Sequence, residues 1–340
     1  MLKRPEIFPD LPPNGGQAGK AGLGRRPGEE GLVLLMVLLL LALMSVMILS
    51  FAQEWRLELL LSRNQLLSRQ AALLAEGGVY YAVGRLVETQ QADRRAPQAA
   101  LGERPAELWR GDGTLRELAL PGGRVLVRVT DESGKVNLNQ APEVLLLRLL
   151  EVLGVEGARA EALVDALADW RDPDHIPRSK GAESDYYAGL SPPYPAKNGP
   201  LDVVEELFWI KGFDYGHFLR LRDLVTVQKT GRGVNLNAAP REVLQALGFT
   251  PEQADTLIQA RQVAPLRSRR ELDQLFLGST TLRFGAPLVF RASHIFEIVS
   301  TGVIEYPARG ASHTVRAVVR VDVTRPRPWE ILLWTDDYWR

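Results

Sequence analysis

The longest apolar stretch of the chain runs from Leu32 to Ala52 and contains no charge, glycine or proline in its 21 residues. An apolar helix of about 20 residues spans a bilayer core about 30 Å thick. A helix also satisfies its own backbone hydrogen bonds, which lipid cannot do. The pattern therefore predicts a membrane-spanning helix over residues 32–52, with a buried helix of a soluble core as the alternative.

Apolar positions continue among charged and amide residues from Gln53 to Gln91, and no proline interrupts them. This pattern predicts that the same helix leaves the membrane and continues in water, with Gly77 and Gly78 as a soft point. Leucines on the aqueous part offer a face for a partner helix, or for packing on the chain's own sheet. The candidates are Leu57, Leu60, Leu61, Leu67 and Leu74.

The C-terminal third and one earlier segment alternate between apolar and polar positions. Residues 123–130, 295–304 and 314–323 have the period of two that is typical of strands. The segment from Arg94 to Gly123 is rich in proline and glycine and predicts a loop. The tail from Trp329 to Arg340 has three tryptophans and is suited to cover a sheet edge or a partner surface.

A repeated motif lies between these strand regions. Val136-Asn-Leu-Asn-Gln-Ala-Pro142 returns 98 residues later as Val234-Asn-Leu-Asn-Ala-Ala-Pro240. Two short apolar helix patterns separated by a turn follow each copy, which predicts two helix-hairpin-helix units. Such hairpins hold phosphate in DNA-binding proteins, but residues 137–172 carry seven acidic and three basic side chains. We therefore favour a structural role for the repeats.

Acidic side chains and prolines gather between the two repeats, in the loop 169–206. Carboxylate and amide oxygens in a flexible loop are suitable ligands for calcium. The spacing of Asp172 and Asp174 resembles the start of an EF-hand loop, although the rest of that pattern is absent. A solvated acidic loop, neutralised by Arg178 and Lys180, is the alternative.

Composition excludes several classes of function. Lys plus Arg and Asp plus Glu both number 41, and this balance argues against binding to nucleic acid driven by charge. The absence of cysteine excludes disulfides, cysteine-bound zinc and thiol catalysis. A periplasmic hydrolase has no support from a Gly-x-Ser-x-Gly motif or from a histidine metal pattern. We predict that the protein is not an enzyme.

The segment before the apolar stretch is rich in proline and glycine and ends in Arg25, Arg26 and then Gly31. A basic leader, a glycine and a retained apolar helix are the pattern of type IV prepilins, in which the chain is cut after the glycine. An ordinary signal anchor is the alternative. Prepilins usually have Glu at the fifth mature position, where this chain has Met36.

These features together resemble the K-type minor pseudopilins (GspK) of type II secretion, which typically lack that Glu. The resemblance rests on short motifs set in order between the repeats: Asp169-Trp-Arg-Asp172, Gly181-Ala-Glu183, Tyr186-Tyr187, Pro192-Pro193-Tyr194 and Glu205-Glu206-Leu207. It implies an α+β fold in which a long N-terminal helix packs on a small antiparallel sheet. The implied parts are a cleaved leader (1–31), a membrane segment (32–52), a discontinuous pilin-like domain (53–135 and 290–340) and an inserted α-helical domain (136–289).

The resemblance also implies a site and partners. Calcium would bind in the acidic loop, with Asp172, Asp174, Glu183, Asp185 and Asn198 as expected ligands. A prepilin peptidase would cut after Gly31 and methylate Leu32. The expected partners are the I-, J- and H-type minor pseudopilins, the major pseudopilin and the inner membrane, with no nucleic acid.

The function implied is assembly: the protein would cap the tip of the periplasmic pseudopilus and prime its growth, for export of folded proteins across the outer membrane. Most of the chain would lie in the periplasm behind a single span of the inner membrane. The main alternative is a membrane-anchored DNA-binding protein of the DNA-uptake type that uses the two hairpins. A tip adhesin of a true pilus is a variant of the assembly hypothesis.

The prepilin hypothesis predicts the mass of the mature chain. When the protein is produced together with prepilin peptidase, the membrane fraction should contain a chain that begins at methylated Leu32. Without the peptidase, or after Gly31→Leu, the chain should keep residues 1–31. Intact mass spectrometry distinguishes these forms, and an uncut chain in the presence of the peptidase would contradict the prepilin assignment.

Overall fold

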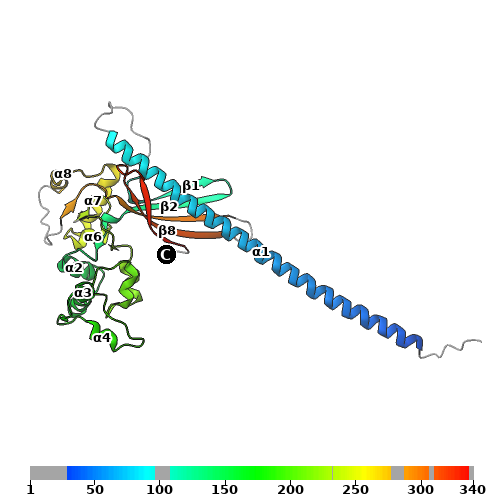
Figure 1. The fold of residues 1–340 in the computed structure, drawn as a ribbon. Coiled ribbons are helices and arrows are strands. Elements are labelled where there is room, and N and C mark those ends of the chain that lie inside the picture. Colours follow the sequence, from blue (N-terminus) through cyan, green and yellow to red (C-terminus); the bar gives the residue numbers. More distant parts are fainter. Residues whose placement is uncertain (1–28, 96–107, 232, 277–286, 306–309, 337–340) are drawn as a thin grey trace, which may run out of the picture. The chain divides into compact units, whose positions relative to one another are not determined.

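The computed structural model describes residues 29–95, 108–231, 233–276, 287–305 and 310–336 (Figure 1). The chain separates into two compact units, Met1–Arg63 and Asn64–Arg340, which we describe individually. Most of the predicted leader, residues 1–28, lies outside the described residues. Gly31 and Leu32 lie near the start of the first helix.

Helix α1 extends from Glu29 to Arg95 without interruption. Its N-terminal stretch, in the first unit, is long and apolar enough to cross a membrane, with a mean hydropathy of 3.2 in its most apolar window. The predicted helix over residues 32–52 is therefore confirmed, and its composition suits a membrane anchor. The second unit contains the remainder of α1 and all other described elements.

A five-stranded antiparallel sheet forms the base of the second unit (Figure 1). Its order is β1-β2-β7-β8-β9, and the strands are β1 (Asp112–Leu120), β2 (Gly123–Asp131), β7 (Ile295–Ile304), β8 (Ala311–Val321) and β9 (Trp329–Thr335). The prediction of a loop up to Gly123 was wrong over β1. Pro121 and Gly122 form the turn of a β1–β2 hairpin, and Gly122 has a φ of 93°.

The sequence predicts that the tryptophan-rich tail covers either a sheet edge or a partner surface. Its described part forms β9, which pairs with β8 at the edge of the sheet. Trp329 and Trp334 there contact the ring of Tyr80 on α1. The tail therefore completes the sheet and contacts the helix that packs on it.

Helix α1 packs on one face of this sheet through small and branched side chains. Buried residues of α1 form a common cluster with valines of β2 and with residues of β7 and β8; on α1 they are Ala75, Val79, Ala82, Val83 and Leu86. Gly78 permits the close approach, because an added Cβ would collide with the Ser300 hydroxyl and lie 2.5 Å from Val125. The helix is continuous through the glycine pair, and Gly78 is a packing glycine. A soft point at the pair stays a prediction.

The segment between β2 and β7 contains most of the helices and has its own hydrophobic cluster. In order, the elements are η1 (Glu132–Gly134), β3 (Val136–Asn137), α2 (Glu143–Val152), α3 (Gly157–Arg171), α4 (Ser184–Ala188), η2 (Val204–Trp209), α5 (Tyr215–Leu221), β4 (Val225–Thr226), β5 (Val234–Asn235), α6 (Arg241–Ala246), α7 (Pro251–Val263), α8 (Arg269–Leu275) and β6 (Leu288–Val289). A sheet with a long helix and several further helices confirms the α+β class. The finer assignment of helix-hairpin-helix units stays a prediction.

The sequence repeat corresponds to a structural repeat. In the first copy β3 pairs in parallel with β4, and in the second β5 pairs in parallel with β6. Asn139 exchanges hydrogen bonds with the backbone of Leu201, and Asn237 does the same with Leu266. Between the end of the second helix and this closing contact, the first copy has residues 172–200, whereas the second has only 264–265. The acidic loop is therefore an insertion in one copy of a duplicated unit.

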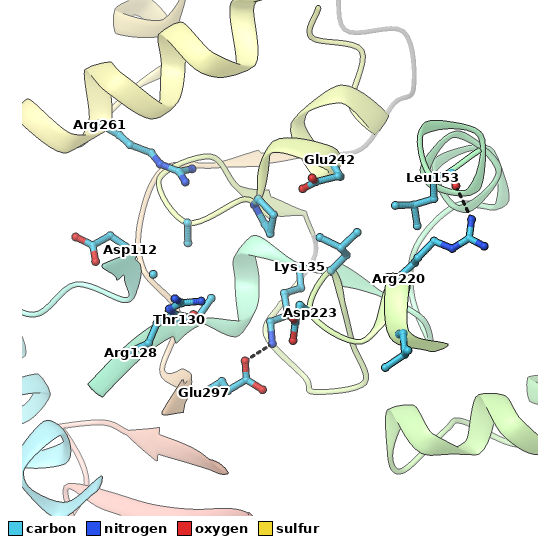
Figure 2. A pocket seen from close by; sticks show the side chains of 15 residues that line it. Asp112, Arg128, Thr130, Lys135, Leu153, Arg220, Asp223, Glu242, Arg261 and Glu297 are labelled. Atoms are coloured by element: carbon cyan, nitrogen blue, oxygen red, sulfur yellow. Dashed lines mark hydrogen bonds and ion pairs between the residues drawn. The ribbon is translucent and has the colours of Figure 1, made fainter. Parts of the chain in front are cut away.

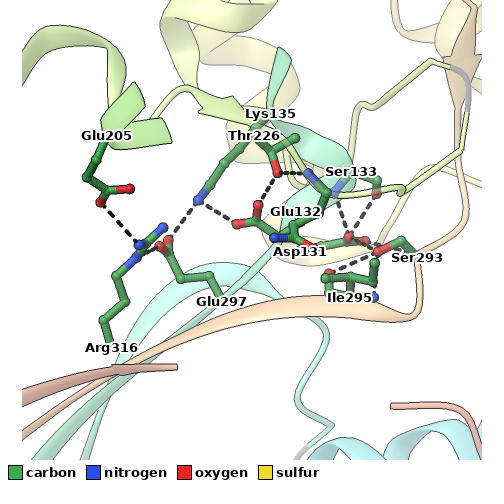
Figure 3. Close-up of polar contacts among 11 residues, drawn as sticks. Asp131, Glu132, Ser133, Lys135, Glu205, Thr226, Ser293, Ile295, Glu297 and Arg316 are labelled. Carbon is green, nitrogen blue, oxygen red and sulfur yellow. Dashed lines mark hydrogen bonds and ion pairs between the residues drawn. The ribbon is translucent and has the colours of Figure 1, made fainter. Parts of the chain in front are cut away.

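A buried network of charges joins the helical segment to the sheet (Figure 3). Lys135 Nζ lies 2.6 Å from Glu132 Oε1 and 2.8 Å from Glu297 Oε2 of β7. Arg316 of β8 also pairs with Glu297, and Thr226 of β4 donates to Glu132. We call Glu132, Lys135, Glu297 and Arg316 the charge clamp; all four are buried.

The end of β2 is fixed next to this clamp by a second buried carboxylate. Asp131 is fully buried and accepts hydrogen bonds from Ser133, Asn235 and Ser293 (Figure 3). Asn235 belongs to the second copy of the repeat, so this carboxylate connects the sheet to both ends of the helical segment. The junction therefore depends on polar contacts more than on a shared apolar core.

The clamp predicts a dependence of stability on pH. Burial raises the pKa of Glu297, but Lys135 and Arg316 outweigh this effect and lower it from 4.5 to about 2. A group with a lowered folded-state pKa stabilises the fold above its unfolded pKa, and this contribution is lost as the pH falls from 4.5 towards 2. Urea unfolding should show this loss, on the order of 3 kcal/mol.

Glu297→Gln should lower the free energy of unfolding at pH 7 by roughly 3–5 kcal/mol, because two buried cations lose their shared partner. It should also flatten the profile below pH 4.5. Glu330→Gln is the matched control, since Glu330 forms an exposed pair with Arg320 and should cost about 0–1 kcal/mol. Equal stability of both variants would contradict the role of the clamp.

Candidate functional site

The acidic loop begins at the end of α3, where Asp169 is fully buried. Both oxygens of the Asp169 carboxylate accept from the backbone N–H of Arg178, at 3.1 and 3.3 Å. Gly181 packs against this carboxylate so closely that an added Cβ would overlap it. Asp169 therefore folds the loop back onto α3. From the sequence, Asp169 is recognisable only as the first residue of the Asp169-Trp-Arg-Asp172 motif, which does not indicate this role.

Three carboxylates of the predicted calcium site come together. Asp172 is the residue directly after α3, Asp174 follows two residues later, and Glu183 is the residue directly before α4. One oxygen from each of these side chains lies within 4.8 Å of the others. These three residues form the acidic cluster, which is a geometry suited to a cation.

Several oxygens around the acidic cluster have no hydrogen-bond partner. Both carboxylate oxygens of Glu183, Oδ1 of Asp172 and Oδ1 of Asn198 are buried without a donor. Glu183 is only 5% exposed. Buried carboxylates without a partner are costly, and a hard cation that accepts six to eight oxygen ligands would satisfy them. The residues present therefore fit calcium.

The electrostatics agree with this fit. Burial and the neighbouring charges of Asp169 and Asp172 raise the pKa of the Glu183 carboxyl. Burial is also the main cause that raises the pKa of Asp169, with a contribution from Asp172. A cation among these groups would reverse the repulsion and hold the carboxylates in their charged form.

The remaining ligand candidates differ in position. Asn198 has a φ of 48°, and its amide nitrogen bonds to the loop at Asp174 and His175. Asp185 is exposed in the first turn of α4 and is not among the three clustered carboxylates. Its role as a ligand stays a prediction.

The leucines proposed for partner contact fall into two groups. Leu57, Leu60 and Leu61 lie exposed in the first unit. Leu67 is 8% exposed and forms a cluster with Ala71 and Ile304, against which Leu74 also packs. These two leucines serve the chain's own fold, so the structure does not leave Leu67 available to a partner.

An outward face of α1 was missed by the sequence analysis. Leu66, Leu73 and Tyr80, seven residues apart, are 57%, 67% and 44% exposed in the second unit. Spacing by seven is the period of a helix-to-helix seam. The seven-residue spacing can be read from the sequence. The sequence does not show which leucines of this helix face outward, because Leu67 and Leu74 have the same spacing. Because the Tyr80 ring already contacts Trp329 and Trp334 of β9, we call only Leu66 and Leu73 the outer seam.

A cavity of about 460 Å³ lies between the sheet and the helical segment (Figure 2). Its lining includes Lys135 and Glu297 of the charge clamp, which bond to each other, and Arg220, which donates to the carbonyl of Leu153. The lining has three further carboxylates and three arginines, so these charges are equal in number: Asp112, Asp223 and Glu242, with Arg128, Arg220 and Arg261. We assign the cavity no ligand, because its lining does not have an excess of positive or negative side chains that would select a charged ligand.

The chain was compared with known proteins. The family described as type II secretion system (T2SS), protein K, matches residues 124–230 and 234–288. Type II secretion system protein K of Pseudomonas aeruginosa is 29% identical over 319 residues, which cover 87% of this chain and 93% of that protein. Its counterpart in Klebsiella pneumoniae is 31% identical over 261 residues, 71% of this chain and 76% of that protein.

A solved structure is also similar. A chain in the crystal structure of the GspK-GspI-GspJ complex from the enterotoxigenic Escherichia coli type 2 secretion system matches 81% of this chain and 98% of its own length. The TM-score is 0.55 and the sequence identity is 22%, so this likeness concerns the fold alone.

A long apolar N-terminal helix on an antiparallel sheet, together with these sequence relatives, places the chain in the class of minor pseudopilins. The relatives identify which one. The chain belongs to the type II secretion system protein K family.

The acidic cluster predicts calcium-dependent stability. Calcium chloride, added to chelator-treated full-length protein in detergent, should raise the melting temperature, since a ligand at 100 times its Kd adds about 2.7 kcal/mol. Glu183→Gln should weaken calcium binding more than tenfold, because it removes one charge from the ligands.

Glu151→Gln is the matched control, because Glu151 is an exposed carboxylate of α2 outside the acidic cluster, and it should leave calcium affinity within twofold of wild type. Titration calorimetry measures both affinities. An equal loss in the two variants would contradict a calcium site built on the acidic cluster.

Proposed function

We propose that this protein is the tip subunit of the pseudopilus, which assembles with I-type and J-type minor pseudopilins and primes growth of the filament. The observation that supports this best is the outer seam of α1, together with a related fold found in a GspK-GspI-GspJ complex. The H-type and major pseudopilins are further expected partners. The role is mechanical and not enzymatic.

The outer seam is suited to a parallel helix from a neighbouring subunit. Leu66 and Leu73 are large apolar side chains that remain more than half exposed, although the adjacent face of the same helix buries Leu67 and Ala71. A helix with apolar residues on two faces is stable in water when both faces are covered. The sheet covers one face, and a partner helix would cover the other.

The membrane segment constrains how such partners meet. Subunits that share an apolar N-terminal helix are held in the same bilayer, so their helices meet side by side at a high effective concentration. We propose a single span of the inner membrane, with the second unit in the periplasm. In this arrangement the prepilin peptidase removes residues 1–31 and methylates Leu32.

The helical segment would give the subunit its position at the tip. It adds a separate hydrophobic cluster to the helix-and-sheet core, and this bulk would block a further subunit from stacking above. Calcium bound by Asp172, Asp174, Glu183 and Asn198 would neutralise the loop and hold it to the end of α3. The two helix pairs of the repeat would then be structural hairpins.

The alternative of a DNA-uptake protein has no support from the family models, relatives and solved structure described above, which concern type II secretion. The acidic surroundings of the first helix pair also disfavour phosphate binding. We therefore do not retain it.

Assembly through the outer seam predicts a specific loss. Leu66→Glu and Leu73→Glu should each leave folding within about 0.5 kcal/mol, because both sites are exposed. Each should lower co-purification with the I- and J-type pseudopilins at least tenfold, since a charge would be buried in the seam.

Ser68→Glu is the matched control, because Ser68 is exposed on the same helix away from the seam. It should retain the complex. Pull-down from detergent extracts measures the three variants. Complexes formed equally by Leu66→Glu and by wild type would overturn the role of the seam.

A further inference from the structure

The side chain of Asn198 is oriented by its neighbours before any cation arrives. Its Nδ2 donates to His175 Nδ1 at 2.8 Å and to the carbonyl of Asp174 at 3.2 Å. Its Oδ1 is buried and accepts no hydrogen bond. Because the amide is planar and rigid, fixing the nitrogen on one side fixes the oxygen on the opposite side.

We propose that His175 is a positioning residue of the cation site, which holds the Asn198 amide so that its oxygen faces the cation. This inference rests on the proposed calcium site. It goes beyond that site, because neither composition nor spacing distinguishes His175 from the other exposed residues of the loop.

The alternative orientation of the amide explains why such a residue is needed. If the amide turned over, its NH₂ group would take the place of the buried Oδ1, next to Asp174 of the acidic cluster. A donor there could satisfy carboxylate oxygens such as those of Glu183, which accept no hydrogen bond. That arrangement would be favourable without a cation and would oppose binding, since a donor would occupy the place of a ligand. A neutral His175, with Nδ1 as acceptor, stabilises the orientation that is competent to bind.

The backbone at this position supports the choice of residue. Asn198 is the only described non-glycine residue with a positive φ, at 48°. Asparagine and aspartate tolerate this region better than most other residues. Aspartate would supply an oxygen in both orientations, whereas asparagine supplies one oxygen and therefore depends on an orienting partner. Partners of this kind commonly change metal affinity when they are removed.

The test uses the full-length protein in detergent and measures calcium affinity by titration calorimetry. His175→Ala should weaken calcium binding between threefold and tenfold, whereas His175→Asn, whose Oδ1 can replace Nδ1 as acceptor, should stay within twofold of wild type. Melting temperatures without calcium should be equal, because His175 is exposed.

A second pair of variants tests whether His175 acts by orienting the Asn198 amide or changes calcium affinity in another way. In the Asn198→Asp background, His175→Ala should have no further effect on calcium affinity, since a carboxylate needs no orientation. The same fold loss in both backgrounds, or unchanged affinity in His175→Ala alone, would overturn the inference. Absence of calcium binding by the wild type would instead refute the calcium site of the proposed function, and this inference with it.

Discussion

The structure of the second unit depends on a buried carboxylate that is shared by two cations. Glu297 of β7 pairs with Lys135, which follows β2, and with Arg316 of β8. Removing one member would leave a buried charge without a partner, which costs several kcal/mol. Apolar packing holds each hydrophobic cluster together, but this clamp fixes the helical segment on the sheet. Any role that requires the helical segment to be held firmly therefore depends on a polar junction.

The duplicated unit shows how a binding loop can be added without a new fold. Both copies close in the same manner, through Asn139 on Leu201 and through Asn237 on Leu266. The first copy accommodates a long acidic loop between these points because the closing contacts do not depend on what lies between them. Asp169 and Gly181 then fold the loop back onto α3, and the carboxylates converge where the loop returns.

Helix α1 has two adjacent apolar faces, one buried and one exposed. Leu67 packs inward on the sheet, and Leu66 remains exposed. Gly78 lies within the same continuous helix and brings it close to β2 and β7. One helix can therefore hold its own sheet and still present a surface to a neighbouring subunit.

The sequence by itself determined the apolar segment suited to a membrane anchor, the long helix, the repeat and the family. It also determined three strands, predicted over 123–130, 295–304 and 314–323. These features depend on local periodicity or on motif order, both of which a linear pattern records. It located the acidic loop, but it did not separate Asp185 from the three clustered carboxylates. The strand at 112–120, the packing role of Gly78, the charge clamp and the outward leucines were decided only by the tertiary structure. Each of these features depends on which segments, distant in sequence, meet in space. The local sequence around a helix turn or a glycine is compatible with several such arrangements, so it does not select one.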